Sequence, residues 1–123
     1  MASVTNPDVF SISTSVRGDV LVVTVSGEVD LTTAPELTRA IHLTSAHTSR
    51  LVADLAGVTF LDSSGLNALV RGSRALEERG VGFRVVAGPD GPVRRLLDLT
   101  QLLDLLHVVD AFEDAVADDD PGR

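Results

Sequence analysis

One stretch decides how this chain folds: Thr59-Phe60-Leu61-Asp62-Ser63-Ser64-Gly65-Leu66-Asn67-Ala68-Leu69. The apolar run 51–55 precedes it and predicts a buried strand. Behind it, residues recur at the spacing of a helix that buries one face, namely Leu66, Leu69, Val70, Ser73 and Leu76. The polar segment 62–65 therefore lies where a strand passes into a helix, among the free N–H groups of the first helical turn.

Ser64 is the residue of interest in this segment. A hydroxyl at or beside a helix N-terminus lies at the positive end of the helix dipole, which favours an anion, including a phosphate attached to the serine itself. The alternative is that Ser64 is only a helix cap, the commoner role for such a serine. Two interpretations of Asp62 also stay open, since its carboxylate could orient the turn or face a partner.

Upstream of this stretch the sequence predicts a hairpin and a helix. In residues 10–16, Phe10, Ile12, Thr14 and Val16 alternate with serines, and residues 20–25 are mostly β-branched, which predicts two antiparallel strands around a tight turn. Thr33 and Glu36 fit a capping box, and Pro35 fits the first turn of a helix that ends near 45–47.

Downstream, Gly80 is the expected left-handed residue that ends the second helix. There follow a strand at 82–87, a helix with Val93, Leu96 and Leu97 on its buried face, an edge strand within 105–109, and a helix that starts at Asp110. This order predicts an α/β fold: a single domain with a small mixed β-sheet, an N-terminal hairpin plus parallel strands, flanked by about four helices. We expect the domain to span 9–117, between a flexible N-terminus, 1–8, and an acidic flexible tail, 118–123.

Composition and charge exclude several classes of function. The 123 residues carry a formal net charge of −8, and all 10 cationic side chains are Arg. An acidic chain gains nothing from counterion release on DNA or RNA, so we expect no direct nucleic-acid binding. The sequence has no Cys, no secretory signal and no apolar run of spanning length, so we expect a cytoplasmic protein without disulfides or membrane insertion.

Recognisable catalytic chemistry is absent from the sequence. The serines do not fit G-x-S-x-G, and a phosphate-binding P-loop requires a Lys, which this chain lacks. The three histidines, His42, His47 and His107, show no acid–base or metal-ligand spacing. We therefore predict a protein that is not an enzyme, with no catalytic residue, no metal site and no cofactor.

Two motifs in this order carry a family resemblance. The segment Asp62-Ser63-Ser64-Gly65-Leu66 follows a strand that ends in Asp-Leu, and Gly27-Glu28-Val29-Asp30 lies upstream. Together they make the chain, from about Phe10 to about Val116, similar to the STAS family and, within it, to the stand-alone bacterial anti-sigma factor antagonists, or anti-anti-sigma factors. The family fold is a small mixed sheet flanked by helices, in agreement with the element order.

The resemblance implies a partner-switching regulator of transcription. Its unphosphorylated form would bind an anti-sigma factor that is also a serine kinase, and so release a sigma factor. Phosphorylation of Ser64 would switch the protein off, with Ser63 as the weaker candidate acceptor, and a PP2C-type phosphatase would reset it. ATP is then a substrate of the partner and not a cofactor of this chain. The free protein is expected to be a monomer.

The resemblance also assigns a partner-binding surface, made of Asp30, Thr33, Asp62, Ser63, Ser64, Gly65, Leu66 and Asn67. Asn67 departs from the family, where Gly is frequent, and this puts the choice of partner in doubt rather than the phosphoacceptor. Gly65 permits a close backbone approach, either by the kinase or by a neighbouring strand. Asp30 and Thr33 also fit plain turn and cap residues.

Two other functions stay open at this point. A lone STAS protein could be an accessory subunit of a membrane lipid-transport ABC complex. A helix N-terminus at a strand end could also hold the phosphate of a nucleotide, although the missing Lys and glycine-rich loop count against that function.

Overall fold

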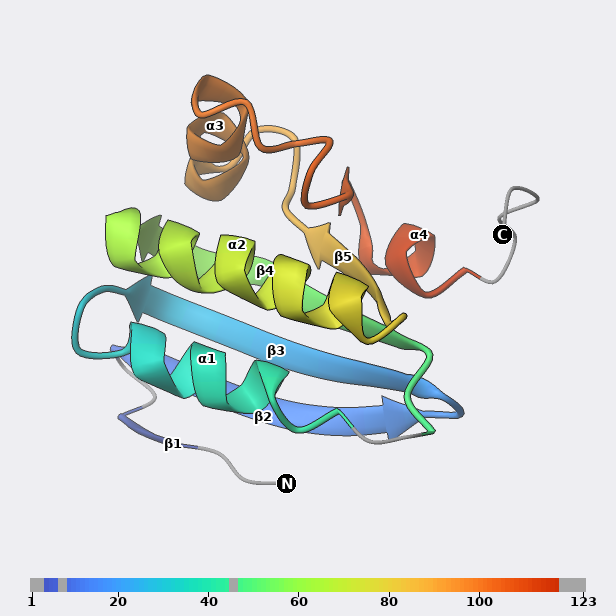
Figure 1. The fold of residues 1–123 in the computed structure, drawn as a ribbon. Helices are drawn as coiled ribbons and strands as arrows, with labels where there is room; N and C mark the ends of the chain where they lie inside the picture. Colours follow the sequence, from blue (N-terminus) through green and yellow to red (C-terminus); the bar gives the residue numbers. More distant parts are fainter. Residues whose placement is uncertain (1–3, 7–8, 45–46, 118–123) are drawn as a thin grey trace.

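A six-stranded sheet organises the chain (Figure 1). The computed structural model describes residues 4–6, 9–44 and 47–117, so the predicted acidic tail, 118–123, lies outside the described residues. The strands lie side by side in chain order: β1 (Val4–Asn6), β2 (Phe10–Arg17), β3 (Val20–Val29), β4 (Arg50–Leu61), β5 (Gly82–Val86) and β6 (Val108–Val109). The helices are α1 (Ala34–Ile41), α2 (Ser63–Glu78), α3 (Pro92–Leu99) and α4 (Phe112–Val116).

The sheet is mixed, as predicted. β1, β2 and β3 pair antiparallel, whereas β3, β4, β5 and β6 pair parallel. This arrangement confirms the N-terminal hairpin plus parallel strands. β1 adds to the prediction, because it lies within the segment 1–8 that was expected to be flexible, and its backbone pairs with β2, Val4 opposite Ile12.

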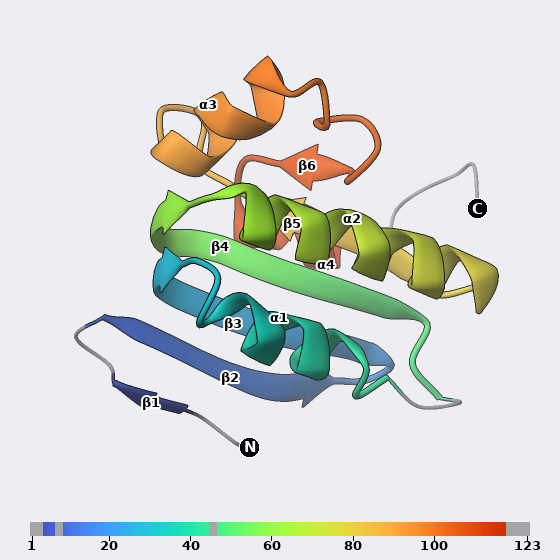
Figure 2. The same ribbon diagram turned by 60° about the vertical axis from the view of Figure 1, so that its left-hand side comes forward.

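Helices cover both faces of the sheet, as Figures 1 and 2 show. α1 and α2 lie against one face, and α4 lies against the other. The side chains of β4 alternate between these faces, as strand geometry requires. Leu51, Ala53 and Leu55 belong to the main core, whereas Val52 packs with Ala115 of α4 in a smaller cluster.

Several element boundaries differ from the prediction. β3 continues to Val29 and β4 to Leu61, whereas the sequence predicts strands that end at 25 and 55. Register shifts in the β3–β4 ladder let the pairing continue beyond those points. α1 ends at Ile41, before the predicted 45–47, while Gly80 has the predicted left-handed conformation, with φ of 73°.

The capping box predicted at α1 is wrong. Thr33 occupies the N-cap position, but its side chain makes no cap hydrogen bond. Its hydroxyl turns back toward the end of β3, and Glu36 pairs instead with Arg39 at 3.0 Å.

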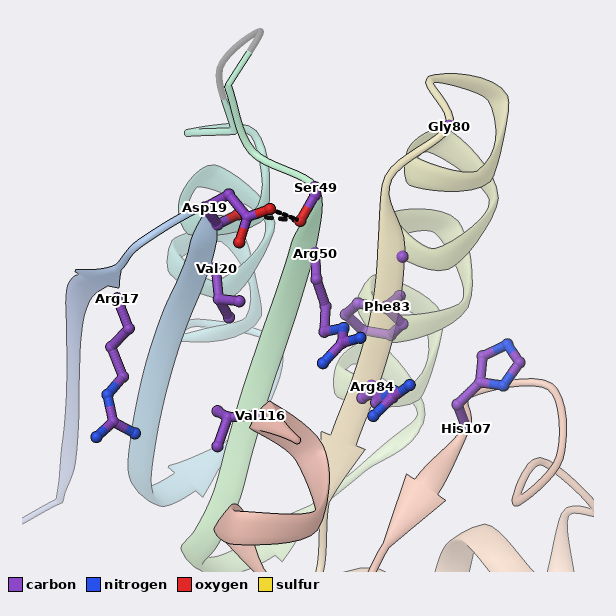
Figure 3. Close-up of a pocket in the computed structure, with 11 residues that line it drawn as sticks. Arg17, Asp19, Val20, Ser49, Arg50, Gly80, Phe83, Arg84, His107 and Val116 are labelled. Atoms are coloured by element: carbon purple, nitrogen blue, oxygen red, sulfur yellow. Dashed lines mark hydrogen bonds between the residues drawn. The ribbon is translucent and has the colours of Figure 1, made fainter. Parts of the chain in front are cut away.

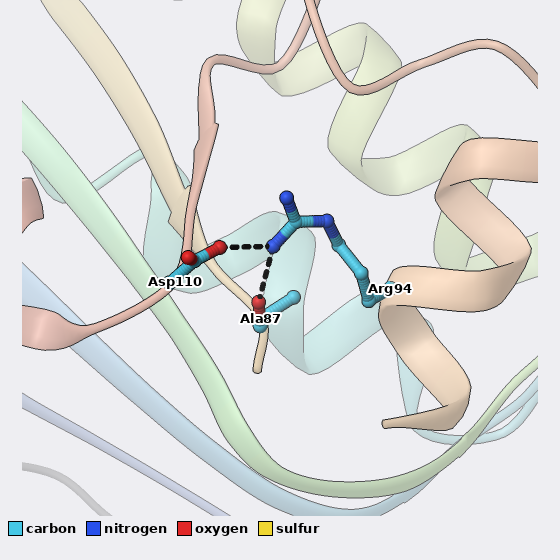
Figure 4. A network of polar contacts seen from close by, with 3 residues as sticks. All are labelled: Ala87, Arg94 and Asp110. Carbon is cyan, nitrogen blue, oxygen red and sulfur yellow. Dashed lines mark hydrogen bonds and ion pairs between the residues drawn. The ribbon is translucent and has the colours of Figure 1, made fainter. Parts of the chain in front are cut away.

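The predicted start of the last helix is also wrong. Ala111 is the N-cap residue of α4, so Asp110 lies outside it. The Asp110 carboxylate instead pairs with the Arg94 guanidinium at 2.6 Å, and Arg94 also donates to the carbonyl oxygen of Ala87 at 3.0 Å (Figure 4). This network joins α3 to the segments that follow β5 and β6.

Candidate functional site

The predicted site lies at the carboxyl-terminal ends of β3 and β4. These parallel strands end in register, with Val29 opposite Leu61, so Asp30 and Asp62 are the first residues beyond two neighbouring strand ends. The backbone N–H of Asp62 donates to the carbonyl oxygen of Val29 at 3.2 Å. The structure therefore brings together the two segments that the sequence presents as separate motifs.

Asp62 is the N-cap residue of α2. Its backbone is extended, and its Oδ1 accepts hydrogen bonds from the backbone N–H groups of Ser64 at 2.8 Å and Gly65 at 3.3 Å. Such a cap satisfies donors that no helical carbonyl reaches and stabilises a helix by roughly 1 kcal/mol. The turn-orienting interpretation of Asp62 is thus observed, and its contact with a partner stays a prediction.

The two serine hydroxyls lie in the first turn of α2 without capping it. Ser63 is exposed and Ser64 is half-buried, and neither hydroxyl has a hydrogen-bond partner within the described part of the chain. Every buried side-chain oxygen of the described residues does have a partner, so the Ser64 hydroxyl reaches the surface. The interpretation of Ser64 as the helix cap is wrong, because Asp62 fills that position. The Ser64 hydroxyl lies at the end of a 16-residue helix where the dipole favours an anion.

Asp30 organises the turn between β3 and α1. Its Oδ1 accepts hydrogen bonds from the Thr32 hydroxyl at 2.8 Å, the Thr32 N–H at 3.0 Å and the Thr33 N–H at 3.2 Å. These bonds, that of the Thr32 hydroxyl foremost, favour the carboxylate and lower the pKa of Asp30 below its ordinary value of 3.8. Asp30 is therefore an anion at neutral pH.

Thr33 closes the same turn. Its hydroxyl accepts from the backbone N–H of Asp30 at 2.8 Å and donates to the carbonyl oxygen of Glu28 at 2.9 Å. Because both bonds join the Thr33 hydroxyl to the end of β3, this hydroxyl does not cap α1, and the capping box does not form. The turn role predicted for Asp30 and Thr33 is observed, and their contact with a partner stays a prediction.

The next three residues of the motif differ in exposure. A Cβ at Gly65 would lie 2.2 Å from Leu61 Cδ1 and 3.0 Å from Val29 Cγ1, so the close approach of α2 to the strand ends accounts for the glycine. Leu66 is half-buried against the main core, and Asn67 is exposed. Contact between a partner and any of the three stays a prediction.

Two exposed apolar side chains that the sequence analysis did not single out flank this edge. Leu31, which follows Asp30, is 76% exposed, and Phe60, which precedes Leu61, is 49% exposed. Large exposed apolar groups rimmed by polar residues are typical of protein-binding sites. The exposure of Leu31 could have been predicted from the sequence, because this residue is apolar inside a polar turn. The exposure of Phe60 could not, because an apolar residue within a strand is ordinarily assigned to the core.

Comparison with known proteins decides the family. The STAS domain profile matches residues 11–115. The chain belongs to the STAS domain family. This confirms the resemblance carried by the serine motif and the upstream Gly27–Asp30 segment, and it agrees with the mixed sheet and its flanking helices.

Relatives of this STAS domain protein include named regulators. An anti-sigma-B factor antagonist from Staphylococcus epidermidis is 33% identical over 104 residues, which cover 84% of this chain and 95% of the relative. The crystal structure of an anti-sigma factor antagonist from Mycobacterium paratuberculosis is 36% identical, with a TM-score of 0.79 over 92% of this chain and 96% of that chain. The anti-sigma factor antagonist SpoIIAA in its unphosphorylated form shares the fold, with a TM-score of 0.65 at 19% identity over 84% of this chain and 90% of that chain. These three names describe regulatory proteins and not enzymes.

Within residues 4–6, 9–44 and 47–117, no helix combines the length and the apolar character needed to cross a bilayer. The same part of the chain holds no group of three or more His, Asp or Glu side chains placed to bind a metal ion.

Proposed function

We propose that this STAS domain protein is an anti-sigma factor antagonist. In its unphosphorylated form it binds an anti-sigma factor that has serine-kinase activity, and so releases a sigma factor. Two relatives that share 33% and 36% identity carry the name antagonist. The observation that carries the proposal is the Ser64 hydroxyl, which lies at the start of α2 with no hydrogen-bond partner among the described residues.

The surface around Ser64 has the composition of a protein-binding site. Leu31 and Phe60 supply exposed apolar area, which is the part of an interface that contributes most when a partner covers it. Asp30 and Asp62 supply carboxylates at the same edge. Within the described residues, the hydrogen bonds to the Asp30 carboxylate all use Oδ1, which leaves Oδ2 to accept from a cationic side chain of the partner.

Phosphorylation of Ser64 would act on this surface through charge. The kinase transfers the γ-phosphoryl group of ATP to Ser64 Oγ, the hydroxyl proton leaves to a base of the kinase, and ADP departs. The phosphoserine adds about −1.5 to −2 charges at neutral pH. Opposite a partner carboxylate at about 5 Å and an effective dielectric of about 20, repulsion is roughly 3 kcal/mol per pair of unit charges before screening. That repulsion weakens binding by about a hundredfold.

The fold should tolerate the same phosphate. An anion in the first turn of a helix is stabilised by about 0.3–1 kcal/mol through the dipole. Modification of Ser64 is therefore expected to disrupt the interface and to preserve the domain. A PP2C-type phosphatase resets the switch by hydrolysing the phosphoserine, and the free protein is a cytoplasmic monomer in this proposal.

Incubation with the candidate anti-sigma kinase and ATP, followed by mass mapping of the phosphate, tests the proposal. The Ser64→Ala variant should lose the modification, and the Ser63→Ala variant, altered one residue earlier, should keep it. A phosphate at Ser63 or at another residue, with a partner that binds the unmodified chain, would contradict the assignment.

The lipid-transport alternative is not favoured. The relatives at 33% and 36% identity are named as antagonists. A pull-down separates the two functions: recovery of a histidine-kinase-like ATPase supports the antagonist, whereas recovery of an ABC ATPase supports the transport subunit.

A further inference from the structure

A polar pocket lies at the opposite edge of the sheet, at the amino-terminal ends of the parallel strands (Figure 3). Its volume is ≈ 730 Å³, within the range of about 300–1,000 Å³ typical of ligand pockets. The strand register aligns several of its residues in one row, with Arg17 opposite Val20, Val20 opposite Arg50, and Arg50 opposite Gly82.

This pocket is cationic although the protein is acidic. Among the described residues, Arg17, Arg50 and Arg84 line it together with one carboxylate, that of Asp19, whereas the whole chain carries a net charge of −8. The three arginines reach the pocket from β2, β4 and β5, three different strands (Figure 3). Like charges around one space repel each other, and an anion between them relieves that repulsion.

Helix α4 holds the three guanidinium groups in place. Arg50 is 8% exposed, and its Nη1 donates to the carbonyl oxygens of Ala115 at 3.1 Å and Ala117 at 2.9 Å. Nη1 of Arg84 also donates to the carbonyl oxygen of Ala115, at 3.4 Å. The Arg17 guanidinium lies 5.2 Å from the centre of the Phe112 ring. These contacts orient the guanidinium groups before any ligand arrives, which lowers the entropy cost of binding.

The contacts of Arg17 and Arg84 leave donors unused. A guanidinium has five N–H donors, and the carbonyl bonds of Arg84 use Nη1 alone. In the described part of the chain, neither Arg17 nor Arg84 forms an ion pair with a carboxylate. Both side chains therefore retain charge and donors that an anion can use.

We propose that this pocket binds a small phosphorylated molecule. A phosphate group offers several oxygens and close to two charges, which match two planar guanidinium groups better than a single carboxylate does. Val20, Phe83 and Val116 are the apolar side chains of the pocket lining and can contact the apolar part of such a ligand. The site lies at the edge opposite Ser64 and does not depend on the function proposed above.

Titration of the full chain with inorganic pyrophosphate tests this site by calorimetry and by amide NMR shifts. We expect saturable binding tighter than about 1 mM, with the largest shifts at Ser49, Arg50 and Gly82 and none at 63–65. The full chain is used because Asp118, Asp119 and Asp120 follow Ala117 in sequence, so any competition from their carboxylates is included in the measured affinity.

Two variants and a matched control complete the test. Arg17→Gln and Arg84→Gln should each weaken pyrophosphate binding at least about tenfold, the effect of losing a charged hydrogen-bond donor. Arg74→Gln removes the same charge from an exposed position on α2 outside the pocket, and should change the affinity less than about twofold. Equal weakening by Arg74→Gln, shifts centred on 63–65, or no binding to the wild-type chain would each overturn the proposal.

Discussion

The two edges of the sheet hold their charged side chains in different ways. At the carboxyl edge, which is formed by the carboxyl-terminal ends of β3 and β4, the Asp62 carboxylate accepts from the N–H of Ser64. The Asp30 carboxylate likewise accepts from the N–H of Thr32, so each bond joins residues two apart in the chain. At the amino edge, which is formed by the amino-terminal ends of the parallel strands, Arg50 donates to the carbonyl oxygens of Ala115 and Ala117, 65 and 67 residues further along the chain. The carboxyl edge is thus built by local sequence, whereas the amino edge exists only once α4 has packed on the sheet.

This difference predicts a division of roles. The local bonds at the carboxyl edge leave Ser64, Leu31 and Phe60 open to a partner, so changes to these side chains should alter binding more than stability. The long-range bonds at the amino edge tie α4 to the sheet, so the loss of Arg50 should alter stability first.

The largest effect is expected from Ser64→Glu. A carboxylate at this position should weaken binding of the anti-sigma partner by about a hundredfold, because it places an anion inside the contact surface. The melting temperature should stay within about 2 °C of wild type. Calorimetric titration of the partner and thermal unfolding measure the two quantities.

Two controls interpret this result. Ser64→Ala should bind the partner nearly as tightly as wild type, since it removes no hydrogen bond among the described residues. Ser13→Glu adds the same charge at an exposed serine on β2, outside the predicted partner-binding surface, and reports the effect of charge alone. If Ser64→Glu bound the partner with wild-type affinity, the proposal that a negative charge at Ser64 prevents binding would be wrong.

Arg50→Met should have the largest effect on stability. It retains much of the side-chain volume but removes the Nη1 donor that bonds the carbonyl oxygens of Ala115 and Ala117, and Ala115 then keeps only the longer bond from Arg84 at 3.4 Å. We expect the free energy of unfolding to fall by about 2–3 kcal/mol, measured by urea denaturation. Arg39→Met is the control, because its ion pair with Glu36 lies on the surface and should contribute less than about 1 kcal/mol. Equal losses in both variants would contradict the special role of the amino edge.

The same division explains how much of the fold the sequence predicts. The hairpin, the helix after the serine motif and the parallel strands follow from side-chain alternation and helical spacing, which are local patterns. The sequence did not predict β1 or the continuation of β3 to Val29 and β4 to Leu61. These features depend on which strand lies alongside, and on register shifts that no short pattern contains.

The candidate site follows the same rule. The segment 62–65 and Asp30 were predicted, because their geometry comes from bonds between close neighbours in sequence. The capping box at Thr33 failed because the hydroxyl found its partners at the end of β3. Phe60 and the arginine pocket could not be predicted, since their exposure and grouping follow from tertiary packing.

Asp62→Ala should have a smaller effect on stability than Arg50→Met. Loss of the N-cap of α2 should lower the free energy of unfolding by about 1 kcal/mol. Asp62→Asn retains an oxygen that can cap the helix and should lower the free energy of unfolding by only about 0.3 kcal/mol. Comparing the affinities of these variants for the partner separates the cap role of Asp62 from contact with the partner. Weaker binding in Asp62→Asn, with stability retained, would show that the partner interacts with the negative charge of Asp62. Wild-type binding in Asp62→Asn would restrict Asp62 to its cap role.

The smallest expected effect concerns the charge of Asp30. Its hydrogen bonds, that of the Thr32 hydroxyl foremost, hold the pKa of its carboxyl below 3.8 in the folded chain. A group whose pKa falls on folding stabilises the fold above its unfolded pKa, and this contribution is lost as the pH drops through the folded pKa.

Carboxyl NMR titration should therefore give a pKa below 3.8 for Asp30, and Thr32→Val should raise that pKa toward the ordinary value, because it removes the hydroxyl donor while keeping the shape of the side chain. Thr38→Val, at an exposed position on α1 with no bond to Asp30, is the matched control and should leave the titration unchanged. An unchanged pKa in Thr32→Val would mean that local hydrogen bonds do not set the charge at this edge, and the contrast with the long-range bonds of Arg50 would then rest on Asp62 alone.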